Sequence, residues 1–204
     1  MRGRAANRVP SIATSQAART GESRFRAGRT ATLLDVGSVT LRLATVGDAE
    51  QIRMIYNHEV MHTTATFDLV PRSLPDQEAW LADRTGAFAT LVAVDPDDAD
   101  GHVVGFAALS PYKDRAAYRT SVEDSVYVRR DRNGEGIGSM LLRQLLEVAA
   151  NSGFHAVFAR INTAGDTSIA LHRKLGFDMV GIEREVGRKF NRWHDVALMQ
   201  HLLA

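Results

Sequence analysis

The sequence predicts an α/β fold in which helices flank a mixed β-sheet. Three observations support this: apolar residues alternate in several short runs, recur at helical spacing in others, and these runs follow the order βαα–βββ–α–β–α–ββ. A chain of 204 residues, 45% hydrophobic and 24% charged, is long enough for one globular domain with a sizeable core.

The N-terminal part of the domain is predicted to hold two helices and three strands. VTLRLAT alternates as a strand does, and Asp48 stands as an N-cap before the helical run DAEQIRMIYNHEV. TTATFDLV is β-branched and expected to be extended, and Asp76 is expected to cap a second helix, DQEAWLADRT. FATLVAVD and HVVGFAALS flank the turn PDDADG and are expected to pair as a hairpin.

The C-terminal part is predicted to alternate strands and helices and to end in a strand pair. SVEDSVYV is a strand that leads through a glycine-rich turn into the helix GSMLLRQLLEVA. HAVFARI is expected to be a strand and TSIALHRKLG a helix that Gly176 ends as a C′ residue. DMVGIEREV and HDVALMQHLL are expected to pair as the last strands.

Residues 1–34 differ in composition from the rest. Residues 1–30 contain seven arginines and one acidic residue, Glu22, so their net charge is about +6. Since the net charge of the whole chain is +1, residues 31–204 carry about −5. The segment lacks periodicity and is expected to be a disordered extension, with residues 35–204 forming the domain. A transit peptide, a nucleic-acid contact and a start codon placed too early are the other interpretations.

Composition also limits function. The acidic balance of the domain argues against a nucleic-acid surface on it. No apolar run approaches the roughly 18 to 20 residues of a membrane span, and the N-terminus lacks the apolar core of a secretory signal. The chain has no cysteine, which excludes disulfides, thiolate metal ligands and a Cys nucleophile. We expect a cytoplasmic protein.

The glycine-rich turn carries Gly134, Gly136 and Gly138 between a strand and a helix. Glycine lets the backbone approach a ligand closely, and N–H groups at a helix N-terminus favour an anion. Positive charge is added by three neighbouring residues: Arg129, Arg130 and Arg132. The turn is therefore predicted to hold a pyrophosphate.

Three pyrophosphate ligands compete with the simpler interpretation of a tight turn that binds nothing. A P-loop requires a Lys-Ser/Thr pair that is absent here. A dinucleotide motif has G-x-G-x-x-G and stands first in its domain, whereas this turn has G-x-G-x-G and is central. The third ligand is an acyl-coenzyme A.

Several segments together resemble the GCN5-related N-acetyltransferase (GNAT) superfamily. NGEGIG resembles its acetyl-CoA motif, and SIALHRKLGF its second helix motif. Over roughly residues 39–203 the chain resembles the phosphinothricin or methionine sulfoximine acetyltransferase branch, in IYNHEVMHTTATF, PYKDRAAY, VEDSVYV, LHRKLGF and RKFNRWHDVALMQ. The resemblance implies the GNAT fold, a mixed and mostly antiparallel sheet with splayed central strands. It also implies an acetyl-CoA donor, a small amino-acid-like amine as acceptor, no metal and a homodimer.

The same resemblance assigns residues to the cofactor. The strand edge at Val126, Tyr127 and Val128 would face the pantetheine arm and the thioester. The pyrophosphate and the second motif would involve Asn133, Gly134, Glu135, Gly136, Ile137, Gly138, Ser139, Gly165 and Lys174. Two of these depart from the motifs: Asn133 replaces Gln or Arg, and Gly165 replaces an Asn that helps to hold the cofactor.

Two residues are catalytic candidates. The resemblance makes Glu123 the general base that accepts the ammonium proton, and alternation puts it on one face of its strand with Asp124 on the other. A solvated strand carboxylate is the simpler interpretation. His172 stands where many relatives have a Tyr that protonates the departing thiolate, although a single helix His is often structural.

Lys113, Arg115 and Arg119 stand just before the predicted base strand and could bind the acceptor's acidic group. The resemblance favours Lys113 and Tyr118, with Arg119 also a candidate, and Phe67 and Trp193 could wall the pocket. Core packing or surface charge is the simpler interpretation of each. No metal is expected, because the histidines lack ligand spacing. Two other functions stay open: a GNAT enzyme for an antibiotic, a polyamine or a protein N-terminus, and a non-catalytic CoA-binding module.

Overall fold

The computed structural model describes residues 37–84, 86–99 and 102–203, so the predicted extension over residues 1–34 lies outside the described residues. By its contacts the chain divides after Leu33, and the description below concerns the unit from Leu34 to Ala204.

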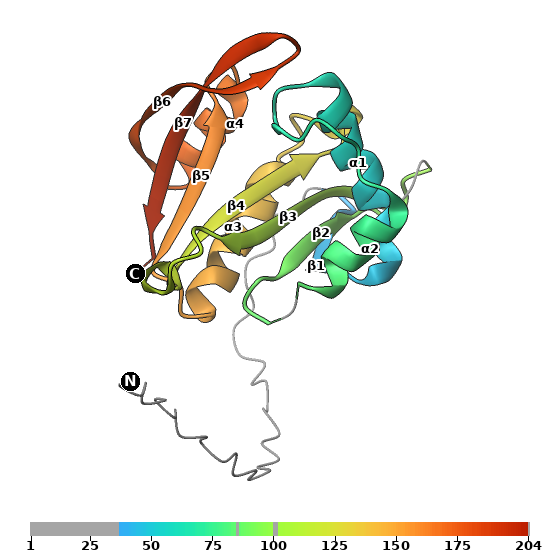
Figure 1. Cartoon of the computed structure of the whole chain (residues 1–204). Helices are drawn as coiled ribbons and strands as arrows, with labels where there is room; N and C mark the ends of the chain where they lie inside the picture. Colours follow the sequence, from blue (N-terminus) through green and yellow to red (C-terminus); the bar gives the residue numbers. More distant parts are fainter. Residues whose placement is uncertain (1–36, 85, 100–101, 204) are drawn as a thin grey trace, which may run out of the picture. The chain divides into compact units, whose positions relative to one another are not determined.

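A single seven-stranded sheet organises this unit (Figure 1). Its strands lie in the order β1-β2-β3-β4-β5-β7-β6, and every neighbouring pair is antiparallel except β4 with β5. The strands are β1 (Thr40–Leu43), β2 (Thr90–Val94), β3 (Val103–Pro111), β4 (Ser121–Val128), β5 (Ala156–Asn162), β6 (Asp178–Lys189) and β7 (Arg192–Leu202). The predicted mixed, mostly antiparallel sheet is therefore confirmed.

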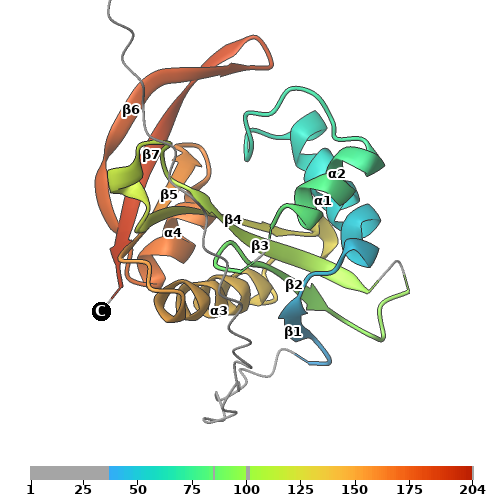
Figure 2. The ribbon, with the colours of Figure 1, turned by 60° about the horizontal axis from the view of Figure 1, so that its bottom comes forward.

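The helices occupy both faces of the sheet, as Figure 2 shows for β2 to β4. They are α1 (Ala49–His62), α2 (Leu74–Ala82), α3 (Ile137–Asn151) and α4 (Asp166–Lys174). Ile52 and Tyr56 of α1 pack with Phe106, whereas Leu141 and Leu145 of α3 belong to the larger core on the opposite face. Among the described residues, no helix is both long and apolar enough to cross a membrane. The predicted order of elements is confirmed.

The helix starts differ in detail from the prediction. Asp48 is the N-cap residue of α1, as predicted, but its carboxylate accepts from the Thr45 N–H at 2.7 Å and pairs with Arg42, so its side chain makes no capping hydrogen bond to α1. The second helix begins at Leu74, two residues before the predicted cap. Ser73 is its N-cap, and Asp76 forms the other half of a capping box. The predicted cap residue is therefore correct for α1, whereas for α2 the cap is Ser73 instead of Asp76.

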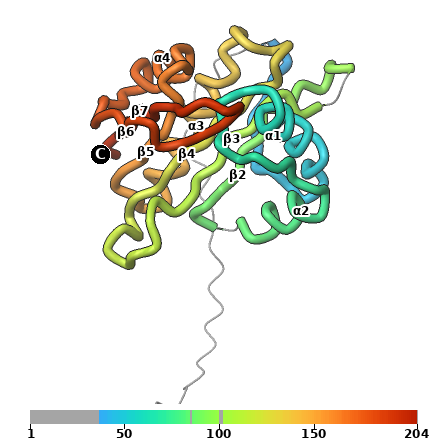
Figure 3. The backbone as a smooth tube through the Cα atoms, turned by 45° about the horizontal axis from the view of Figure 1, so that its top comes forward, coloured from blue at the N-terminus to red at the C-terminus, as the bar shows by residue number. Residues whose placement is uncertain are grey.

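The run TTATFDLV forms the loop between α1 and α2 and contains no strand. The β6–β7 hairpin tip lies beside this loop (Figure 3). Lys189, only 3% exposed, donates to the Thr66 carbonyl at 2.7 Å and to the Glu59 carbonyl at 3.3 Å. The Phe67 ring lies so close to Gly187 that a Cβ there would fall 2.2 Å from it. This loop therefore contacts the β6–β7 hairpin through the side chains of Lys189 and Phe67 and does not pair with it as a strand.

Candidate active site

The two central strands pair over only part of their length. β4 and β5 pair with each other at Ser121↔Ala156, Val122↔Val157 and Glu123↔Phe158. Beyond these residues each strand continues next to its other neighbour, β3 or β7, but the two no longer pair with each other. Figure 1 shows β4 and β5 diverging toward their C-terminal ends. We call the unpaired stretches, residues 124–128 and 159–162, the β4–β5 opening. It exposes backbone N–H and C=O groups to a ligand in the middle of a sheet.

The predicted glycine turn lies directly after the open end of β4. Gly134 and Gly136 have φ of +87° and +85°, the left-handed region that glycine favours, and Gly136 is the N-cap of α3. Within the described residues, no backbone N–H from Gly134 to Ser139 has an acceptor. Gly138 lies in the first turn of α3, where a Cβ would approach Leu171 at 3.4 Å. A row of unused donors at a helix N-terminus suits a pyrophosphate.

Ion pairs hold the loop that leads into this turn. Arg129 pairs with Asp98 at 2.6 Å, and Arg132 pairs with Asp98 at 3.0 Å and with Glu135 at 2.8 Å. Arg130 reaches across to Glu59 of α1, with its Nε 2.7 Å from the carboxylate. The three arginines therefore brace the loop with carboxylates, which differs from the expected free cations at its mouth.

Glu123 lies at the last paired position of β4, where the opening begins. Its carboxylate is half-buried and has no hydrogen-bond partner among the described residues. Burial raises the pKa of Glu123, and the charges of Asp124 and Glu183 add to the rise while Arg160 opposes it. A carboxyl group with a raised pKa and free lone pairs is suited to accept a proton.

Asp124 points to the opposite face and is paired there. It is 7% exposed, and its Oδ2 lies 3.1 Å from Nε2 of His172, which is 3% exposed. Nδ1 of His172 lies 2.7 Å from the Ser168 carbonyl oxygen, which only accepts, so Nδ1 carries a proton. Burial opposes charge on the imidazole, but the hydrogen bond and charge of Asp124 outweigh it and raise the pKa of His172. Both ring nitrogens are therefore engaged, and no ring N–H is free for a departing thiolate.

An aromatic and cationic cluster adjoins Glu123. Phe158, the partner of Glu123 in the β4–β5 register, stacks on Tyr112 with ring centroids 4.1 Å apart. Tyr112 and Tyr118 line a polar hollow of about 650 Å³, together with Lys113, Asp114 and Arg115. The Lys113 Nζ lies 4.7 Å from the Tyr112 ring and 5.3 Å from the Tyr118 ring. Lys113 and Tyr118, two of the predicted acceptor residues, thus line the same hollow.

The other predicted acceptor residues, and Lys174, which is predicted to contact the cofactor, do not line this hollow. Phe67 packs on the β6–β7 hairpin, 5.9 Å from the His194 ring, and Trp193 is 60% exposed with Arg188 over its ring. Arg119 is exposed just before β4, and Lys174 is the exposed last residue of α4. The described residues include no cluster of three metal-ligating side chains.

Sequence reasoning missed Tyr112, Phe158 and Lys189. Tyr112 stands beside the predicted Lys113, but only the register between β4 and β5 brings Phe158 against it. Lys189 resembles any charged residue near a hairpin tip, and nothing in its sequence context marks it as buried. Each depends on a contact between distant segments.

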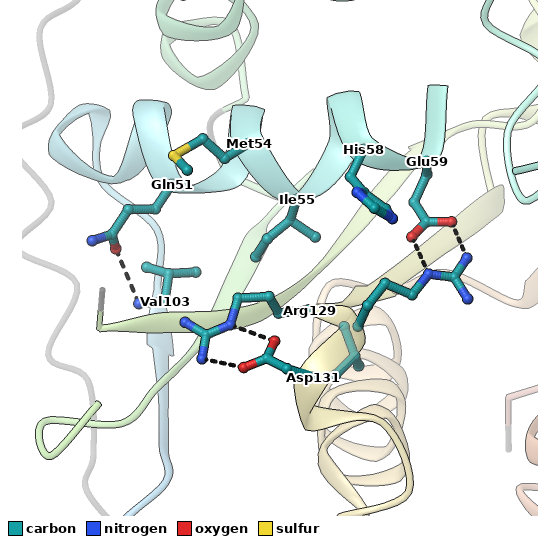
Figure 4. A pocket seen from close by; sticks show the side chains of 10 residues that line it. Gln51, Met54, Ile55, His58, Glu59, Val103, Arg129 and Asp131 are labelled. Atoms are coloured by element: carbon teal, nitrogen blue, oxygen red, sulfur yellow. Dashed lines mark hydrogen bonds and ion pairs between the residues drawn. The ribbon is translucent and has the colours of Figure 1, made fainter. Parts of the chain in front are cut away.

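A second hollow of about 320 Å³ lies on the α1 side of the glycine loop (Figure 4). It is lined by Met54 and Ile55 of α1 and by Val128 and Arg129, and the Gln51 side chain accepts the Val103 N–H at 3.0 Å. Of the predicted site residues, it includes Val128 alone. The hollow shares Val128 with the β4–β5 opening and otherwise lies between α1 and residues 129–131, which lead into the glycine turn.

Fold and site together define a class. A sheet that opens between two central parallel strands, beside a loop of free amides at a helix N-terminus, is built for a long anionic ligand that ends next to a carboxylate. That is the arrangement of an acyltransferase that takes its acyl group from a coenzyme.

Comparison with known proteins identifies the family. The family of the acetyltransferase (GNAT) domain matches residues 41–198. An L-methionine sulfoximine/L-methionine sulfone acetyltransferase of Pseudomonas aeruginosa is 40% identical over 164 residues, covering 80% of this chain and 94% of that protein. A phosphinothricin N-acetyltransferase of Streptomyces coelicolor is 38% identical over 161 residues, covering 78% and 93%. The chain belongs to the GNAT acetyltransferase family, which confirms the resemblance.

A solved structure supports the same assignment. The GNAT phosphinothricin acetyltransferase of Sinorhizobium meliloti, in complex with acetyl-CoA, matches with a TM-score of 0.77 at 37% identity and covers 82% of this chain and 90% of its own. The predicted GNAT fold and N-acetyltransferase activity are confirmed by these relatives.

Proposed function

We propose that this protein transfers an acetyl group from acetyl-CoA to the amine of a small amino acid that carries a second acidic or strongly polar group. Methionine sulfoximine, methionine sulfone and phosphinothricin are the acceptors to which the relatives' names point. The observation that carries the proposal is the position of Glu123 where the β4–β5 opening begins, beside Phe158, which stacks on Tyr112 of the aromatic, cationic hollow. Its carboxyl group has a raised pKa and no hydrogen-bond partner among the described residues.

The donor is proposed to bind along the open edge of β4. The free amides from Gly134 to Ser139 hold the pyrophosphate, with the side chains of Asn133 and Glu135 at the loop surface. The pantetheine arm follows the backbone of residues 126–128, and the thioester ends near Glu123. The relative solved with acetyl-CoA supports this choice of donor.

The chemistry is a direct transfer. Glu123 removes the proton from the ammonium group of the acceptor, directly or through water. The neutral nitrogen attacks the thioester carbon, and a backbone N–H of β4 stabilises the oxyanion. The C–S bond then breaks, coenzyme A leaves as the thiolate, and the new amide nitrogen loses its remaining extra proton to solvent. No covalent enzyme intermediate is required.

The acceptor's acidic group is proposed to bind in the hollow at Lys113 and Tyr118. A cation held 4.7 Å from the Tyr112 ring offers charge, and the phenol rings offer flat apolar walls. Arg119 follows Tyr118 directly and adds positive charge before β4, whereas Phe67 and Trp193 lie at the β6–β7 hairpin and are not part of this hollow. A small, doubly polar amino acid matches these groups better than a polyamine, whose positive charges Lys113 and Arg115 would repel.

For His172 we propose a positioning role. Its imidazolium neutralises Asp124 beneath the opening and ties α4 to β4. Gly165 and Lys174, at the two ends of α4, are proposed to lie near the cofactor. We further propose a cytoplasmic homodimer with the catalytic domain at residues 35–204.

The test is a thiol-release assay with acetyl-CoA and a panel of amines. Methionine sulfoximine, methionine sulfone and phosphinothricin should give kcat/KM at least about tenfold above methionine, the matched control without the polar group, since one charge-assisted contact is lost. A polyamine and a peptide N-terminus complete the panel. Turnover restricted to either of these, or acetyl-CoA binding without any turnover, would refute the proposal.

A further inference from the structure

Asn162, the last residue of β5, has one half of its amide group unused. Its side chain is buried, at 7% exposure. Its Oδ1 accepts the Ala164 N–H at 2.9 Å, and its backbone carbonyl accepts the Gly165 N–H at 2.8 Å. Because a backbone N–H can only donate, Oδ1 is the end that faces Ala164, and Nδ2 is the end left over. Nδ2 is buried without an acceptor in the described part of the chain.

The register places this donor at the β4–β5 opening. The last parallel pair is Glu123↔Phe158, and Tyr127 and Asn162 each follow it by four residues. Parallel strands rise equally per residue, so Asn162 stands at the height of Tyr127 across the unpaired gap. The orphaned amide therefore lies at the end of β5 that lines the opening.

The turn after β5 provides no other side-chain amide. Gly165 is the N-cap of α4 and has no side chain to offer, and a Cβ added there would lie 3.0 Å from the Asn162 carbonyl oxygen. Buried N–H groups in native proteins are almost always satisfied, and an unsatisfied one signals a missing partner. An amide N–H needs a carbonyl or another oxygen acceptor.

We propose that Asn162 Nδ2 donates a hydrogen bond to a carbonyl oxygen of the pantetheine arm of the coenzyme. The arm carries two amide carbonyls, and both are present in CoA as well as in acetyl-CoA. This inference rests on the proposed binding of the arm along β4, and it is independent of which amine accepts the acetyl group. Asn162 would thus bind the coenzyme from β5, across the opening from the edge of β4 along which the arm is proposed to lie.

Two variants remove the Nδ2 hydrogen-bond donor and keep the acceptor that the Ala164 N–H requires. Asn162→Asp keeps an oxygen for the Ala164 N–H and replaces the Nδ2 donor with an acceptor. Asn162→Ser removes the donor without adding charge, and its hydroxyl still caps the turn. Each is titrated calorimetrically with CoA, with acetyl-CoA and with adenosine 3′,5′-bisphosphate, the fragment that lacks the arm.

We expect both variants to weaken CoA and acetyl-CoA about tenfold, a typical loss for one buried hydrogen bond, and to bind the fragment as the wild type does. Wild-type CoA affinity in both variants overturns the inference, as does a loss with Asp alone, which would mark charge repulsion. An equal loss of the fragment would mark a distorted loop and also overturns it. If the wild type binds no CoA, the proposed function itself fails, and that result is distinct from all of these.

A rise in the KM of the amine, with CoA affinity unchanged, would assign Asn162 to the acceptor and overturn the inference as well. Thermal melting of each variant verifies that the turn has folded, since Ala164 retains its acceptor in both.

Discussion

Glu123 and Asp124 are consecutive carboxylates on β4 with opposite surroundings. Glu123 faces the side of α1, half-buried, without a hydrogen-bond partner among the described residues, and burial raises its pKa. Asp124 faces the side of α3, buried at 7% exposure and bound to His172 at 3.1 Å. One peptide unit separates a carboxylate with open lone pairs from one fixed in an ion pair.

The difference shows how a strand assigns two roles to one functional group. A base must hold its proton weakly enough to release it and must reach the substrate, so it lacks a permanent partner. A buried charge without a partner is costly, and the His172 imidazole lies 3.1 Å from the Asp124 carboxylate. The alternation of side chains across the sheet makes both possible at neighbouring positions.

The largest effect on turnover is expected from a change at Glu123, the proposed base. Glu123→Gln should lower kcat by about 10²- to 10⁴-fold, the usual contribution of a general base, because the amide cannot take the ammonium proton. The acetyl-CoA dissociation constant should change less than about twofold. Steady-state turnover with calorimetric titration measures both.

Ser125→Ala, on the same face of β4, serves as the matched control and should keep turnover near that of the wild type. Wild-type turnover in Glu123→Gln would remove Glu123 from the chemistry.

The next effect concerns stability. Asp124→Ala leaves His172 buried without its counter-charge, and breaking such a pair costs about 3–5 kcal/mol. The free energy of unfolding from urea titration should fall accordingly, while the folded fraction at low temperature keeps far more turnover than Glu123→Gln. Turnover lost to the same extent, with stability intact, would reverse the two roles.

The smallest effect is a dependence of stability on pH. The pKa of His172 is raised in the folded state, so its contribution is fully present below the unfolded value of about 6.5 and is lost as pH rises through the folded value. The free energy of unfolding should therefore decrease over that window, by at most about 1.4 kcal/mol per pH unit for this one proton. His172→Gln should flatten this decrease, and an unchanged slope would show that another group titrates.

Local patterns predicted several structural features of the candidate site. Gly134 and Gly136 have positive φ values, which agrees with glycines placed in a turn between a strand and a helix. Glycine adopts this conformation readily because it has no Cβ. Alternation placed Glu123 and Asp124 on opposite faces. The grouping of Lys113 with Tyr118 followed from the short segment that contains both.

Contacts across the chain were beyond such patterns. The Asp124–His172 pair joins residues 48 positions apart, and Lys189 reaches Thr66 over 123 positions. The side-chain partner of Asp48 was also not predicted: its carboxylate binds Arg42 of β1 instead of capping α1. Phe67 and Trp193, expected in one pocket with Lys113, gather with the hairpin instead.

By itself the sequence determined the order and type of the elements, the glycine loop and the face on which each β4 side chain lies. These follow from backbone preferences and from hydrophobic periods that act over a few residues. Only the tertiary structure decided where β4 parts from β5, which carboxylate gains a partner and which amide of the β5 turn is left without one. Strand register and burial set these, and both depend on segments that meet only after the chain has folded.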